Sequence, residues 1–130
     1  MMNHNEIYLR VPGGREHVLV IRTVLGSVAL LKDLSVDALD DLRAAANEAC
    51  DLLLNQGMEI NAFDMRVCTC DGSLTVAIDA DCAGEGTPMM EEEIEISRAV
   101  LETLMPQVTL EALPCGCIRR VVMTLPRAAM

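Results

Sequence analysis

Aromatic side chains and positive charges are both scarce in this chain of 130 residues. Tyr8 and Phe63 are its only aromatic residues, which excludes a nucleic-acid-binding surface built on base stacking. Ten Lys and Arg stand against 20 Asp and Glu, and the net charge of −10 argues against contacts to phosphate backbones. Long apolar runs are missing too, since no stretch approaches the ~20 apolar residues of a membrane span. We therefore expect a protein that binds neither nucleic acid nor membranes.

We also expect no secretory signal, because the N-terminal segment 1–15 contains no continuous apolar core. This favours a cytoplasmic protein, in which we expect the six cysteines to be reduced. The composition is 52% apolar and 23% charged, as is typical of a globular chain. The length suits a single domain that spans residues 1–130.

The periodicity of apolar residues predicts the order of the secondary-structure elements. Spacing at three and four predicts three helices, at 15–32, 35–56 and 90–105. Alternation predicts five strands, at 6–11, 63–70, 74–78, 108–113 and 117–125. Asp71-Gly72 is a favoured hairpin turn, and 79–88 is expected to be a loop. This order predicts an α+β fold, a two-layer sandwich in which helices cover one face of a mixed or antiparallel sheet.

Three stretches carry a resemblance to a known family. The segment 41–50 ends in Glu48-Ala49-Cys50, the strand 74–78 precedes a glycine-containing loop, and 101–108 is followed by the hairpin 115–125. Together with the order of elements, they resemble the anti-sigma factor serine/threonine kinases of bacteria, which belong to the histidine-kinase-like (GHKL) ATPases. The resemblance implies one histidine-kinase-like ATPase domain. It also implies a sigma factor or a STAS-type anti-anti-sigma protein as partner, and it is compatible with a homodimer.

The resemblance implies a catalytic base and a nucleotide site, and several of the corresponding residues are altered here. Glu48 is retained and would accept the proton of a substrate hydroxyl. The position of the magnesium-binding Asn is Leu52, which offers no oxygen to a hard cation. The position of the adenine-binding Asp is Ala80, although a slip of one residue would bring Asp79 or Asp81 there.

The loop that would cover the phosphates is short and acidic in this sequence. Gly84 and Gly86 are the remaining candidates to approach ATP, while two further family glycines correspond to Glu95 and Ser97. The shortened lid also contains Glu85, Glu91, Glu92 and Glu93. Carboxylates beside a triphosphate repel it. We therefore expect no cofactor, whereas a functional site would take ATP and magnesium.

Three functions are compatible with these residues. The leading hypothesis is an anti-sigma-factor-like regulator that acts by protein–protein binding and has a degenerate ATP site. The first alternative is an active serine/threonine kinase that uses Glu48, with Asp79 or Asp81 on adenine. In either case the acidic run 91–95 is an ordinary solvated helix start or a docking patch for a basic partner.

The second alternative is an interaction domain stabilised by zinc, which the cysteine pairs suggest. Cys68 and Cys70 form one pair, and Cys115 and Cys117 form the other. Gaps of a single residue are unusual in structural zinc sites. Strand alternation also places the two pairs on opposite faces of the sheet. The pattern therefore favours ordinary strand cysteines, and we expect no metal site.

Overall fold

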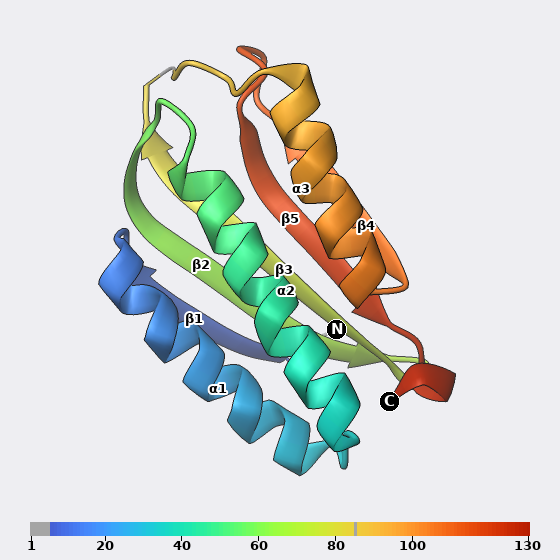
Figure 1. The fold of residues 1–130 in the computed structure, drawn as a ribbon. Coiled ribbons are helices and arrows are strands. Elements are labelled where there is room, and N and C mark those ends of the chain that lie inside the picture. Colours follow the sequence, from blue (N-terminus) through green and yellow to red (C-terminus); the bar gives the residue numbers. More distant parts are fainter. Residues whose placement is uncertain (1–5, 85) are drawn as a thin grey trace.

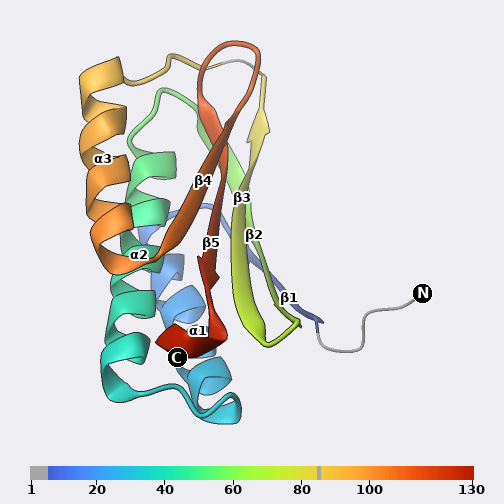
Figure 2. The ribbon, with the colours of Figure 1, turned by 90° about the vertical axis from the view of Figure 1, so that its right-hand side faces the viewer.

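Five strands form one antiparallel sheet, and three helices cover one of its faces (Figures 1 and 2). This computed structural model describes residues 6–84 and 86–130, without the side chain of Cys70. The strands are β1 (Glu6–Pro12), β2 (Glu59–Cys70), β3 (Ser73–Ala83), β4 (Gln107–Ala112) and β5 (Ile118–Leu125). They lie in the order β1-β2-β3-β5-β4, and every neighbouring pair is antiparallel.

The helices are α1 (Val18–Leu31), α2 (Val36–Leu54) and α3 (Glu91–Leu104). Short 3-10 turns precede α1 at Arg15–His17 and close the chain at Arg127–Ala129. The central helix α2 lies between α1 and α3 (Figure 1). Figure 2 shows the helices and the sheet as two layers, which confirms the expected α+β sandwich. No helix within the described ranges is both long and apolar enough to span a membrane.

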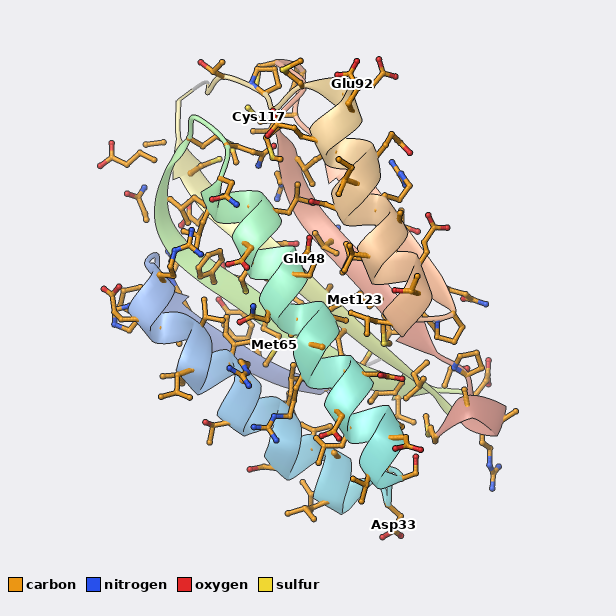
Figure 3. The ribbon with its side chains drawn as sticks, in the orientation of Figure 1. Asp33, Glu48, Met65, Glu92, Cys117 and Met123 are labelled. Atoms are coloured by element: carbon orange, nitrogen blue, oxygen red, sulfur yellow. The ribbon has the colours of Figure 1, made fainter. Side chains whose placement is uncertain are left out.

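The core lies between the two layers and is built from apolar residues at regular spacing. In β3 the residues Leu74, Val76, Ile78 and Ala80 are buried, whereas their neighbours in the strand are partly exposed. This alternation directs one face of the strand to the helices and the other to solvent. Met65 on β2 and Met123 on β5 are also fully buried (Figure 3), so methionine fills volume that aromatic residues occupy in other cores.

Local signals account for the element boundaries that the sequence predicts. Ser35 caps α2, where its Oγ accepts a hydrogen bond from the Ala38 amide at 3.1 Å. Asp71 and Gly72 join β2 to β3 with φ values of 51° and 80°, the left-handed conformation that this hairpin turn requires. Pro106 directly follows Met105, the C-cap residue of α3.

The predicted loop at 79–88 is wrong in its first part, because β3 continues to Ala83. Asp79 and Asp81 extend the strand on the solvent side, where arginines of other strands neutralise their charge. Strand β2 likewise begins at Glu59, earlier than predicted. Acidic and small residues have low strand propensity, so the extension depends on these partners across the sheet.

The buried thiol of Cys50 is expected to resist modification in the folded protein. Burial, and to a lesser extent the charge of Asp51, raises the pKa of Cys50 to about 12. An unfolded thiol titrates near pH ~8.5, so stability is unaffected below that pH and declines as the pH rises above it. Labelling with a thiol reagent at mildly alkaline pH should therefore modify the half-buried Cys68 before Cys50. Modification of Cys50 at the rate of Cys68 would contradict this burial, and a Cys50→Ala variant identifies the labelled peptide.

Candidate functional site

The resemblance places a nucleotide between α2, which carries Glu48, and the segment that follows β3. Glu48 is half-buried and lies on the side of α2 that faces α3 (Figure 3). Leu52, one helical turn further, points into the same interior and is only 1% exposed. Leu101 of α3 is fully buried in the same core cluster. Leu52, four residues after Glu48 on the same helix, is therefore a core residue and is not the lining of an open pocket.

Asp79 and Asp81 lie on the opposite, uncovered face of the sheet. Ala80 stays in phase with Val76 and Ile78 and is buried, so no slip brings an acid to the helix side. Neither aspartate is therefore on the side of the sheet that carries Glu48. The structure does not gather these three candidate residues into one site.

Both aspartates form ion pairs on that face. Arg120 donates two hydrogen bonds to the Asp79 carboxylate, at 2.6 and 2.9 Å. Arg10 bonds to Asp81 and also to Asp64 of β2. These hydrogen bonds raise the pKa of each arginine above its ordinary value. The charges of Asp79 and Asp81 are thus neutralised by arginines of other strands.

The loop after β3 is tied to the end of α2 by backbone hydrogen bonds. The Gly57 amide donates to the Thr87 carbonyl at 2.9 Å, and the Thr87 amide donates to the Gly57 carbonyl at 3.3 Å. Gly86 has no room for a side chain, because a Cβ would lie 2.8 Å from the Gly57 carbonyl oxygen. Gly84 has a φ of 71°, which a turn at the end of β3 requires. Glu85, between them, lies outside the described residues.

Gln56 joins the end of α2 to the start of β5. Its side chain is 6% exposed. Its amide nitrogen donates to the Ile118 carbonyl at 2.7 Å, and its amide oxygen accepts from the Ile118 backbone N–H at 2.6 Å. The glutamine thus satisfies both backbone groups of one residue in the interior. Sequence reasoning missed Gln56, although a glutamine near the end of an apolar helix stripe is a weak signal for such a bond.

The sheet separates Cys68 from Cys117, which are one cysteine from each pair of the zinc hypothesis. Cys117 is fully buried, and burial is the main cause that raises its pKa. Cys68 is half-buried and belongs to the opposite phase of its strand from the buried Met65 and Val67. Within residues 6–84 and 86–130, no three His, Cys, Asp or Glu side chains are grouped as metal ligands would be. The side chain of Cys70 lies outside this description.

The outer face of α3 combines acids with exposed apolar residues. Glu91, Glu92, Glu95 and Ile96 line a hollow of about 420 Å³. Ile96 is 65% exposed, and Val100 is exposed one turn further along the same side. The acidic run was apparent from the sequence as a candidate docking patch. The apolar centre was missed, although Ile96 falls outside the buried stripe of the helix.

A scan against protein-family models and a search of the curated proteins both found no match for this chain.

Proposed function

We propose that this protein is an anti-sigma-factor-like regulator that acts by binding another protein and not by phosphorylation. The observation that carries the proposal is the burial of Leu52, one helical turn after Glu48, in the apolar core. The segment after β3 is also tied to Gly57 through the backbone of Thr87. A general base needs a positioned substrate and a phosphoryl donor, and these contacts leave little room for either.

The outer face of α3 is the binding surface in this proposal. Ile96 and Val100 supply exposed apolar area at its centre, and the acids 91–95 surround the start of the helix. An apolar centre with a charged rim is the usual anatomy of a protein interface. Because the chain has a net charge of −10, a basic partner surface would also be steered towards it. The resemblance suggests a sigma factor or a STAS-type antagonist as the partner class.

An active kinase is supported less well by the geometry. It would need an acid for adenine and an oxygen ligand for magnesium close to Glu48. Asp79 and Asp81 are instead engaged by arginines on the uncovered face, and Leu52 occupies the position expected for the magnesium ligand. We therefore expect Mg-ATP to leave the protein unaffected.

Thermal unfolding with and without millimolar Mg-ATP tests that expectation. A ligand present at a hundred times its dissociation constant adds ~2.7 kcal/mol of stability, which would raise the midpoint by roughly 10 °C. We expect no magnesium-dependent rise, with a Glu48→Gln variant behaving as the unmodified protein. A rise of several degrees that needs both ATP and magnesium would overturn the proposal in favour of the kinase.

The α3 surface is tested by affinity capture from cells that produce the protein, followed by direct binding to each captured protein. We expect Ile96→Glu to weaken the specific interaction at least about tenfold, because a buried interface centre loses apolar contact and gains an unpaired charge. Leu30→Glu is the matched control, since Leu30 is 79% exposed on the distant helix α1. Equal binding by both variants would show that α3 is not the interface.

A further inference from the structure

Two arginines without acidic partners line one hollow between α1 and α2. Arg22 comes from α1 and Arg43 from α2, and together with Asp40, Ala44 and Asn47 they line a space of about 420 Å³. The two helices lie side by side on the sheet (Figure 1). Its volume falls within the roughly 300–1,000 Å³ that is usual for small-molecule sites.

These two arginines differ from most others in the chain because they lack an acidic partner. Acids outnumber bases two to one, 20 against 10, and five other arginines form ion pairs: Arg10, Arg15, Arg66, Arg98 and Arg120. In the described part of the chain, Arg22 and Arg43 form none. The Nε atoms of both are buried without a hydrogen-bond partner. The outer Nη atoms of both guanidiniums are likewise without a hydrogen bond to the described residues, and these are the donors that an acceptor from outside the chain would meet.

The side chains in the hollow match a tetrahedral oxyanion with two charges. Each guanidinium offers planar, fixed N–H donors, and two of them can bind different oxygens of one phosphate group. A carboxylate has only two oxygens, whereas the phosphate of a monoester has three terminal oxygens for the two guanidiniums and Asn47. Asn47 adds an amide nitrogen, whose recorded bond to Asp51 is long at 3.4 Å. Three side chains with N–H donors therefore suit the three terminal oxygens of a phosphate group better than the two oxygens of a carboxylate.

We propose that this hollow binds the phosphate group of a small phosphomonoester between Arg22 and Arg43. Asp40 lies in the same lining and opposes the anion by charge repulsion. Its carboxylate makes the site weaker than two arginines alone would be. The proposal concerns α1 and α2 and does not depend on the α3 surface or on the function proposed above.

Isothermal titration with inorganic phosphate, in buffers matched in ionic strength with chloride, tests the site directly. We expect Arg22→Gln and Arg43→Gln each to weaken binding about tenfold or more, because each removes charge-assisted hydrogen bonds. Arg119→Gln is the matched control, since Arg119 is an exposed arginine on β5 without an ion pair in the described residues. Asp40→Asn should tighten binding about threefold by removing the repulsion.

Several results would overturn the proposal. Phosphate that binds no better than chloride excludes the site, and equal losses in Arg22→Gln and Arg119→Gln show attraction by net charge alone. If the arginine variants fail to fold, the Nε–H resonances of Arg22 and Arg43 in the unmodified protein report binding, with Arg119 as the internal reference. Shifts confined to the first two support the site. Phenyl phosphate and a phosphoserine peptide serve as further probes. If the peptide binds more tightly than phenyl phosphate, the ligand is a phosphorylated protein and the proposal of a small phosphomonoester is wrong.

Discussion

Replacing Leu52 with alanine is expected to lower the free energy of unfolding by about 2–5 kcal/mol. Leu52 is 1% exposed, so its truncation removes apolar contacts and leaves a cavity between α2 and the sheet. Urea denaturation followed by circular dichroism measures the change. Leu54→Ala is the matched control, because Leu54 is only partly buried at the end of the same helix and should cost less. A neutral Leu52→Ala would mean that this space is not part of the core.

A Leu52→Asn variant distinguishes more sharply between the two hypotheses, a regulator without ATP chemistry and an active kinase. In the family that the sequence resembles, the residue at this position is an asparagine that binds magnesium. If only that ligand were missing, the variant would gain a stabilisation by Mg-ATP. We expect instead a loss of stability, because a buried amide without partners is costly, and no response to Mg-ATP. A magnesium-dependent gain would show that a nucleotide pocket can open beside Glu48.

Replacing Gln56 with leucine is expected to lower the free energy of unfolding by about 2–4 kcal/mol. The variant keeps the apolar volume but leaves the N–H and C=O groups of Ile118 without their partner in the interior. Hydrogen exchange should locate the effect, with faster exchange of the Ile118 amide than in the unmodified protein.

Asn55→Ala serves as the control for this change. Asn55 is the exposed neighbour of Gln56, and its side chain accepts a single bond from Arg15 at 3.2 Å. The cost there should stay within about 0.5 kcal/mol. A Gln56→Leu variant as stable as Asn55→Ala would show that the bonds to Ile118 do not hold α2 against β5. The closure of the interior would then depend on apolar packing alone.

Much of the candidate site could not be predicted because its contacts join residues far apart in the chain. The acidic run 91–95 and Glu48 were apparent from their residue types and from the resemblance. The bond from Gln56 to Ile118 spans 62 positions, and no local pattern identifies its partner. The hollow between Arg22 and Arg43 likewise exists only because α1 and α2 are neighbours on the sheet.

The sequence by itself determined the order and type of the helices and strands and, in α2 and β3, which face is buried. Those features follow from apolar spacing, from the Ser35 cap and from the Asp71-Gly72 turn, which act over a few residues. Only the tertiary structure decided that β3 continues through Asp79 and that Leu52 and the Gly57–Thr87 bonds close the interior. The physical reason is that ion pairs and close packing form between segments that are distant in the sequence. The order of the strands in the antiparallel sheet determines which of these segments are in contact.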